Sequence, residues 1–296
     1  MKGMTTQTSF FQVPLEKAIN VSQVSHRSPF RYPGGKTWLV PRIRQWLESL
    51  PYKPTRFIEP FAGGAIVGLT VAFENLAEHV FLVELDEDIA SVWKTILGSN
   101  GPWLADKIRS FSMCEKNLME ILSLPPRTIR ERAFQTIVRN RVSHGGIIAD
   151  GSGIMRSGEN GKGILSRWYP KTLSQRILKL FEIRAKITFL QGNGMEIIQH
   201  RGKGNRNVFF VDPPYTAGGK KAGQRLYKYN NIDHEKLFKI SKHIRGDCLL
   251  TYDDAVEVQE LAVKYGFEFR EIAMQNRHNS MMTELLVGKN LRWLDK

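Results

Sequence analysis

We predict an α/β fold in which a mostly parallel sheet has helices on both faces. Short, unbroken apolar segments alternate with helical segments along the chain, and each apolar segment ends in glycine or acidic residues. Strands that are covered on both faces read as such unbroken runs, and an intervening helix makes consecutive strands parallel. A third observation is that residues 100–180 interrupt this rhythm, which predicts an insertion into the sheet domain.

The order of the elements follows from these local patterns. Glycine and acidic residues mark the strand ends, and apolar helical segments follow the first two strands. The last two strands are close in sequence, so we expect them to form an antiparallel pair. In order, the sequence predicts strands at 56–64 and 79–89, each followed by a helix (65–76 and 90–97), strands at 186–194, 207–215 and 246–254, a helix at 255–267, and closing strands at 267–275 and 283–289.

The interrupting region begins as a helix, "ERAFQTIVRNRV" (131–142). It continues as a long loop or hairpin rich in glycine, serine and charge, "SHGGIIADGSGIMRSGENGKG" (143–163). Long loops in compact proteins are usually functional or disordered. The expected organisation is a flexible N-terminal segment (1–25), a catalytic sheet domain (26–99 and 181–296) and an inserted, largely helical and loop-containing target-recognition region (100–180).

The charge distribution favours a polyanionic partner. The formal net charge is +14, and residues 101–180 hold fourteen Lys or Arg against six Asp or Glu, so +8 of the excess lies there. A basic protein of this size often binds nucleic acid. A solubilising surface is the alternative interpretation.

Composition also excludes several classes of protein. A hydrophobic content of 42% supports a folded core. No apolar run approaches the ~18 residues of a membrane span, and the N-terminus has no secretory signal. Cys114 and Cys248 lie far apart and outside any CxxC, which argues against a disulfide framework or zinc ribbon, and we interpret both as small buried residues. We therefore expect a cytoplasmic protein without membrane contact or a metal.

Two strand ends predict a crevice for a nucleoside. Gly63 and Gly64 follow the first strand, where glycines let a ligand approach the backbone. Glu84 and Asp86 end the second strand roughly 20 residues later, where an acid can bind both hydroxyls of a ribose. Ordinary turn chemistry and solvated acids are the alternatives.

Lys36 in "RYPGGKTWL" follows two glycines, as in a triphosphate-binding loop. That loop requires G-x-x-x-x-G-K-[ST], but Phe30 stands where the first glycine would be, and no apolar strand precedes it. The sequence therefore argues against ATP binding and leaves an aromatic–proline turn before a helix.

The stretch "VFFVDPPY" (208–215) places an acid and two prolines directly after a buried strand. Pro213 and Pro214 lack an N–H and fix φ, so the carbonyls before them are rigidly aimed and unpaired. Asp212 adds a carboxylate acceptor, and Tyr215 adds a flat ring. This set suits a planar group with an exocyclic NH₂, because two acceptors hold both N–H bonds and leave the nitrogen lone pair free. A structural turn is the alternative.

The motifs "RYPGGK", "FIEPFAGG", "LVELDEDI", "FVDPPY" and "TELLV", in this order over residues 28–290, resemble the DNA adenine-N6 methyltransferases of the Dam-like (D12) family. "SRWYPKTL" (166–173) is also similar to a family landmark. The resemblance implies a Rossmann-like methyltransferase sheet with S-adenosylmethionine over its first two strands and S-adenosylhomocysteine as product. It assigns cofactor binding to Tyr32, Lys36, Glu59, Phe61, Gly63, Glu84 and Asp212, and catalysis to Asp212, Pro213, Pro214 and Tyr215.

The sequence departs from the family at two positions. Asn193 stands after the strand before "DPPY", where family members often carry an acid. Tyr32 stands where the family often has tryptophan.

The resemblance also implies a mechanism. The adenine leaves the duplex because its N6 is unreachable in the stack. Tyr215 would stack on it, while Asp212 and the Pro213 carbonyl accept hydrogen bonds from N6 and aim its lone pair at the methyl group. No metal or covalent nucleophile is required. The chain has no Pro-Cys dipeptide, which argues against methylation at the cytosine 5-position, and a serine in place of Asp212 would have suggested cytosine N4.

Basic residues in two segments are the candidate DNA contacts. We expect residues 216–237 to form a mobile loop whose cations touch phosphates, with a solvated loop as the alternative. Base contacts are expected from the 140–170 segment. The candidates are Lys220, Lys221, Arg225 and Lys228 in the loop, and Arg156, Lys162 and Arg167 in the insertion.

Three other functions stay open at this point. The first is a ribosomal-RNA amino-methyltransferase, since several end the same strand with "DPPY" or "NPPY". The second is a catalytically inactive DNA-binding scaffold, and the third is methylation of a protein glutamine amide. The expected partner is double-stranded DNA in a bacterial, archaeal or phage-encoded setting, with the enzyme acting alone or beside a cognate restriction endonuclease.

Overall fold

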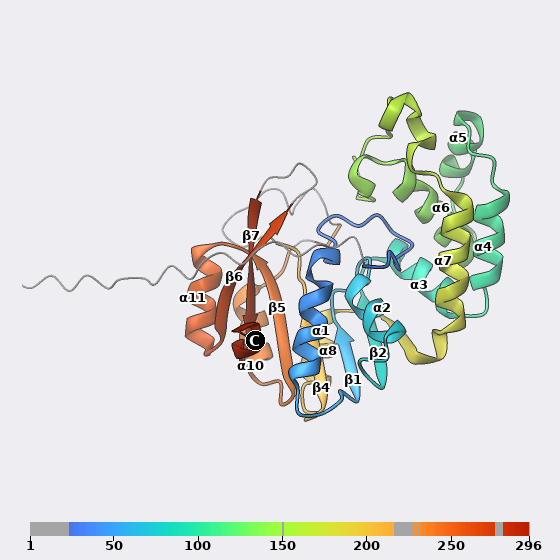
Figure 1. Cartoon of the computed structure of the whole chain (residues 1–296). Coiled ribbons are helices and arrows are strands. Elements are labelled where there is room, and N and C mark those ends of the chain that lie inside the picture. The colour runs from blue at the N-terminus through green and yellow to red at the C-terminus, as the bar shows by residue number, and fades with distance from the viewer. Residues whose placement is uncertain (1–23, 150, 216–227, 230, 276–280, 296) are drawn as a thin grey trace, which may run out of the picture.

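A seven-stranded sheet with the order β3-β2-β1-β4-β5-β7-β6 forms the larger part of the molecule (Figure 1). The computed structural model describes residues 24–149, 151–215, 228–229, 231–275 and 281–295. β1 to β5 are parallel, and β7 runs antiparallel between β5 and β6. The strands are β1 (Arg56–Glu59), β2 (His79–Glu84), β3 (Ile187–Gln191), β4 (Asn207–Val211), β5 (Asp247–Asp253), β6 (Glu268–Gln275) and β7 (Met281–Gly288).

Two hydrophobic cores lie on the two faces of this sheet. Phe57 and Val208 belong to one core, while their chain neighbours Ile58 and Phe209 belong to the other, because successive side chains of a strand point to opposite faces. Strand β4 is therefore buried at every position and is apolar from Val208 to Val211, as the sequence predicts. The first core holds α1 (Val40–Ser49), α2 (Ile66–Phe73) and α3 (Glu87–Leu97), and the second holds α8 (Gly194–Arg201), α10 (His234–Lys242) and α11 (Val256–Tyr265).

Four further helices form a helical part that packs on α3 beside the sheet (Figure 1). Leu104, Ile137 and Ile177 from these helices belong to the same core as Phe57, so the helical part extends the core on one face of the sheet. Thr128 caps the third helix by accepting a hydrogen bond from Glu131 N (3.3 Å). The helices are α4 (Gly101–Ser110), α5 (Glu115–Ser123), α6 (Ile129–Val142) and α7 (Pro170–Glu182).

The connection between α6 and α7 contains little regular structure. Its one isolated β-bridge joins Ser143 and Ile154, so the hairpin considered from the sequence is reduced to a single antiparallel contact within the described residues. Glycines with positive φ allow the chain to reverse there. The described 3₁₀ turns of the chain are Thr37–Leu39, His144–Gly146, Glu159–Gly161, Gly163–Arg167, Arg184–Lys186 and Arg292–Asp295.

The linking segment, residues 28–36, joins the helical part to the sheet. Asn140 accepts from Arg31 N (2.9 Å) and donates from Nδ2 to Arg31 O (2.8 Å). Arg176 Nη1 donates to Ser28 O (2.7 Å), and Arg141 Nη2 donates to Pro29 O. At its other end the segment carries Lys36 to the carboxyl edge of the sheet.

Several expectations need correction or lie outside the described residues. Cys248 is buried as expected, but Cys114 is exposed, because it precedes α5 and its Sγ accepts from Asn117 N at the helix start. The loop expected to reach residue 237 ends earlier, since Asp233 caps α10 and the helix begins at His234. Residues 1–23 of the expected N-terminal segment and residues 216–227 of the loop lie outside the described residues. Across the described ranges, the structure has no helix that could cross a membrane.

Candidate active site

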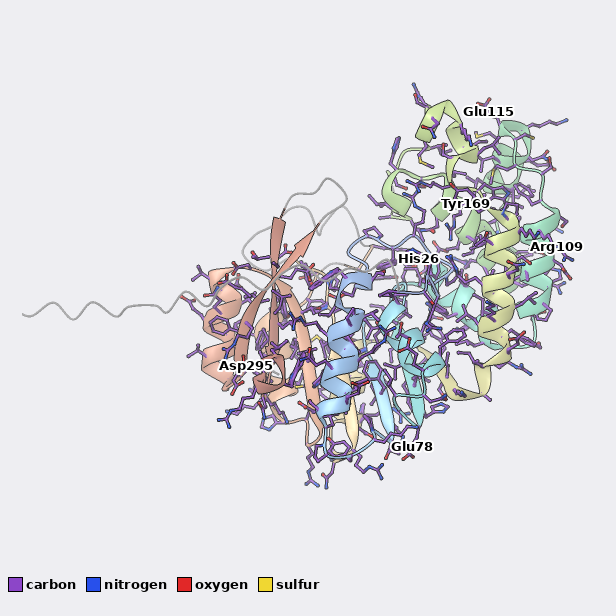
Figure 2. The ribbon with its side chains drawn as sticks, viewed as in Figure 1. His26, Glu78, Arg109, Glu115, Tyr169 and Asp295 are labelled. Carbon is purple, nitrogen blue, oxygen red and sulfur yellow. The ribbon has the colours of Figure 1, made fainter. Side chains whose placement is uncertain are left out.

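The carboxyl ends of the parallel strands open onto a cavity of about 830 Å³. Its walls come from the ends of β1, β2 and β4, from the linking segment and from the helical part. β1 and β4 are neighbours, but the chain leaves β1 toward β2 and β3 on one side and continues from β4 to β5 on the other. Ligands of open α/β sheets bind at this kind of switch point. His26 and Tyr169 both line the cavity, while Glu78 directly precedes β2 at the amino end of the strands (Figure 2).

Three donors converge on one oxygen of Asp212. Lys36 Nζ lies 3.0 Å from Oδ1, Tyr215 Oη donates to it at 2.8 Å, and Thr251 Oγ1 donates to it at 2.7 Å. Asp212 follows β4 directly and is half-buried at the cavity wall. Within the described part of the chain these contacts all use Oδ1, so Oδ2 is the carboxylate oxygen that they leave for a ligand.

Lys36 also contacts a second carboxylate, Glu284 of β7. Its Nζ lies 3.5 Å from Glu284 Oε2 and donates to Gly34 O (2.9 Å), and only 3% of the lysine is exposed. Burial lowers the pKa of Lys36, but Asp212 and Glu284 raise it by more, so the pKa stands above its ordinary value and the amine stays charged. Burial raises the pKa of Glu284 to about 7, against the opposing effect of Lys36. The two carboxylates therefore share one buried cation.

Tyr215 is anchored by its hydroxyl rather than displayed to the cavity. Its Oη donates to Asp212 and lies 3.1 Å from Glu284 Oε2. Its ring stacks on Tyr252, with centroids 5.9 Å apart and planes 22° apart, and Lys36 Nζ lies 4.8 Å from the ring centroid. Of the "DPPY" residues, Asp212 and Pro214 line the cavity, whereas Pro213 is buried beside it.

Glu84 is held by the backbone around it. Its Oε2 accepts from Gly63 N (2.8 Å), and its Oε1 accepts from Leu85 N (2.9 Å) and Asp86 N (3.0 Å). A carboxylate has about four acceptor positions, so three are used and one remains for a ligand. Glu84 lines the cavity, so its remaining acceptor position is available for a hydrogen bond from a ligand.

The glycine turn after β1 is shaped by Tyr32. Gly63 has φ +45°, and a Cβ on it would lie 2.5 Å from the Tyr32 ring, while a Cβ on Gly64 would lie 2.8 Å from Tyr32 Cβ. The glycines therefore allow the aromatic side chain of the linking segment to pack on the turn. Tyr32 and Gly64 line the cavity. Gly63 does not line it, but its N–H donates a hydrogen bond to Glu84, which does.

The remaining sheet-edge residues have clear structural partners. Glu59 is buried and accepts from Gly68 N (2.8 Å) at the start of α2, and burial raises its pKa well above the ordinary value despite this bond. Phe61 is half-buried at the cavity wall. Asn193 also lines the cavity, and its Oδ1 caps α8 by accepting from Met195 N (2.9 Å). An aspartate oxygen could cap α8 in the same way, so this contact does not explain why an amide stands where the family often has an acid.

The expected DNA contacts fall into three groups. Arg167 and Lys228 line the cavity, and Lys228 Nζ lies 2.7 Å from Glu87 Oε1. Arg156 and Lys162 are exposed and do not line it. The third group, Lys220, Lys221 and Arg225, lies outside the described residues. No group of His, Cys, Asp or Glu in the described ranges is arranged to hold a metal ion.

Sequence reasoning assigned no role to Thr251 or Glu284. A signal for Glu284 was present, because an acid inside an otherwise apolar strand requires a buried partner. Thr251 gave no signal, since threonine is an ordinary strand residue. The arginines Arg31, Arg141 and Arg176 were also missed, although all three line the cavity.

The strand order, with β7 antiparallel between β5 and β6, and the cavity at the carboxyl edge define a Rossmann-like methyltransferase fold. Residues 32–121 match the model of the D12 class N6 adenine-specific DNA methyltransferases. The chain is 22% identical over 233 residues to the type II methyltransferase M.CviBI of Paramecium bursaria Chlorella virus NC1A, which covers 78% of this chain and 84% of that one. The resemblance to the D12 family is confirmed, and the protein is an S-adenosylmethionine-dependent methyltransferase.

Two solved structures that align with this chain do so at low TM-scores. The M1A22 tRNA methyltransferase TrmK of B. subtilis aligns with a TM-score of 0.37 and 12% identity, covering 83% of this chain and 64% of that one. The putative methyltransferase yhhF of Escherichia coli aligns with a TM-score of 0.38 and 13% identity, covering 88% and 90%. The chain thus spans just under two thirds of the length of TrmK.

Proposed function

We propose that this protein methylates N6 of an adenine that is flipped out of duplex DNA. The observation that carries the proposal is the Asp212 carboxylate, whose Oδ1 is occupied by three donors while Oδ2 remains for a ligand. An exocyclic amine offers two N–H bonds. Oδ2 would accept one, and the Pro213 carbonyl, which precedes a proline, would accept the other. The match to the D12 class supports adenine as the base.

The sheet side of the cavity fits S-adenosylmethionine. The cofactor is cationic at its sulfonium and amino groups, and the wall contains the acids Glu59, Glu84, Asp86 and Asp212. Glu84 has one acceptor position left for a ribose hydroxyl, and Tyr32 and Phe61 supply apolar contact. When bound there, the cofactor supplies an electrophilic methyl group.

The chain's own residues then act by positioning. Asp212 would hold N6 so that its lone pair is not delocalised into the ring, and Lys36, Thr251 and the Tyr215 hydroxyl keep that carboxylate in one orientation. The ring of Tyr215 packs on Tyr252 in this structure. We propose that its hydroxyl orients Asp212 in the free protein, and that its ring must turn to stack on the base.

We propose duplex DNA as the partner and residues 100–180 as the target-recognition region. The basic excess of this region and the cavity wall that it contributes support the assignment. The same proposal divides the chain into a catalytic domain, residues 26–99 with 181–296, and the target-recognition region, residues 100–180. The similarity to a type II methyltransferase makes a cognate restriction endonuclease a candidate partner.

The test is the identity of the labelled nucleoside. The protein is incubated with duplex DNA and tritiated S-adenosylmethionine, and the DNA is digested to nucleosides. We expect the label in N6-methyldeoxyadenosine. It should be lost in Asp212→Ala and retained in the control Asp106→Ala, because Asp106 is an exposed residue of α4 that pairs with Arg109. Label in RNA alone would favour the ribosomal-RNA alternative, and cofactor binding without transfer to either nucleic acid would favour the inactive scaffold.

A further inference from the structure

The wall of the cavity opposite the sheet is lined by the arginine cluster, Arg31, Arg141, Arg167 and Arg176. These residues come from separate segments: the linking segment, the end of α6, the 3₁₀ turn Gly163–Arg167 and α7. By contrast, every carboxylate that lines the cavity within the described ranges lies in or just after a strand of the sheet. The cavity therefore has an acidic side and a basic side.

Arg141 stands at the centre of this basic side. It is 6% exposed, and its pKa is lowered to about 9, chiefly by burial and also by the charges of Arg176, Arg31 and Arg167. Its Nη2 donates to Pro29 O, but its buried Nε has no hydrogen-bond partner among the described residues. Backbone carbonyls accept hydrogen bonds without supplying the negative charge that a buried guanidinium needs.

The arginines also differ in burial. Arg167 and Arg176 are half-buried at the cavity wall, and Arg176 spends one of its five donors on Ser28 O. The guanidinium geometry matches the oxygens of a phosphate in a bidentate manner. A cationic cofactor is electrostatically suited to the acidic side of the same cavity, which leaves the basic side for an anionic part of the substrate.

We propose that the arginine cluster binds a backbone phosphate of the DNA strand that carries the target adenine. This inference rests on the proposed function, because it requires a nucleic-acid substrate in the cavity. A phosphate held there would fix the strand relative to Asp212, and the base would then have a defined place to enter the cavity. Methyl transfer itself would not use the arginines.

The test is the salt dependence of DNA affinity. The substrate is a labelled duplex fragment that the wild-type protein methylates, and Kd is measured at several salt concentrations between about 50 and 200 mM. Because the cluster binds one phosphate, the slope of log K against log salt should fall in both Arg167→Gln and Arg176→Gln, by up to about 0.9. Arg167→Lys, which keeps the charge, should retain the slope.

The matched control is Arg109→Gln. Arg109 lies on the outer side of the helical part, away from the cavity, and its pairing with Asp106 is exposed (Figure 2). This control changes the net charge equally and should leave the slope unchanged. Thermal unfolding of each variant separates loss of a phosphate contact from loss of the fold, because partial unfolding lowers the active fraction at every salt concentration without changing the slope.

Two results would overturn the inference. One is an unchanged slope in both glutamine variants while the wild-type protein still labels adenine in DNA, which would leave the proposed function intact. The other is a reduced affinity for S-adenosylmethionine with an unchanged slope, which would assign the cluster to the cofactor's carboxylate. If the wild-type protein labels no DNA at all, the proposed function fails first and this inference fails with it.

Discussion

Lys36 Nζ and Asp212 Oδ1 lie 3.0 Å apart, which joins the turn before α1 to the end of β4. The amine is buried, and Glu284 from β7 lies on it as well. One lysine thus holds together two carboxylates that would otherwise repel each other in the same buried space.

Replacing Lys36 should therefore cost both stability and activity. Lys36→Ala leaves Asp212 and Glu284 without their shared cation, and we expect about 3 kcal/mol or more of lost stability in urea unfolding. Methyl transfer should fall by about 10²-fold, because Asp212 loses its fixed orientation. Adding Glu284→Gln should recover part of the stability, so that the two changes are non-additive by about 0.5–3 kcal/mol. Strict additivity would show that the lysine does not couple the two acids.

Glu284 should make stability depend on pH. Burial raises its pKa from an ordinary 4.5 to about 7, so between these values the folded state binds more protons than the unfolded chain. The stability that Glu284 contributes through this extra proton binding is therefore complete below about pH 4.5 and is lost as the pH rises to about 7. In Glu284→Gln this contribution is absent, so the stability of the variant relative to wild type should increase by up to about 3 kcal/mol from pH 4.5 to 7.5.

The measurement for Glu284 is urea unfolding of both proteins across this pH range. Glu59, Glu84 and Asp86 also have raised pKa values, but they are present in both proteins and cancel in the difference. A difference that is constant with pH would contradict the assignment of the titration to Glu284.

The hydroxyl of Tyr215 should matter separately from its ring. Tyr215→Phe keeps the ring but removes the hydroxyl that donates to Asp212 and lies 3.1 Å from Glu284, and a hydrogen bond to a charged group contributes about 1.5–3 kcal/mol. We expect kcat to fall about 10–100-fold with little change in the Kd of DNA. Tyr252→Phe, which removes a neighbouring hydroxyl that contacts His234, is the control. Full activity in Tyr215→Phe would mean that the ring alone carries the role.

Gly63 should not tolerate alanine. Its φ is +45°, and a Cβ would lie 2.5 Å from the Tyr32 ring, so Gly63→Ala must displace the aromatic side chain and weaken the N–H bond to Glu84. We expect a loss of stability above about 1 kcal/mol and a weaker Kd for S-adenosylmethionine by calorimetry. Gly151→Ala is the matched control, because Gly151 also has a positive φ (+83°) but no atom lies within 4 Å of its added Cβ. Equal effects in the two variants would remove Tyr32 from the explanation.

Those elements of the fold that show a regular pattern of residue types along the chain could be predicted from the sequence. Strands covered on both faces carry unbroken apolar runs, so β1, β2 and β4 were predicted correctly. The closing pair β6–β7 was predicted because its two strands are close in sequence. The cavity edge followed, because the carboxyl ends of parallel strands meet at one edge. Helices α4, α5 and α7 were not placed individually, since short amphipathic segments in a charged region resemble loops.

The pairings inside the site could not be predicted in the same way. Thr251 lies beside Asp212 because β5 pairs with β4. Glu284 reaches Lys36 because β7 inserts between β5 and β6, whereas chain order alone suggests that β6 would lie beside β5. The resemblance to a family assigned both Lys36 and Asp212 to cofactor binding, but their pairing was not predicted and required the structure. Cys114 was wrongly expected to be buried, because the position of a helix end cannot be read from residue type.

The insertion of β7 between β5 and β6 has a consequence for how the protein acquires its activity. Lys36 precedes the first strand, whereas Glu284 lies in the last one, so the buried ion cluster closes only when contacts of very high sequence separation have formed. Such contacts form slowly, because a long loop must close before they contribute. A chain emerging from the ribosome therefore has its glycine turn and its "DPPY" motif well before Glu284 is available, and the ion cluster is completed only with the final strand.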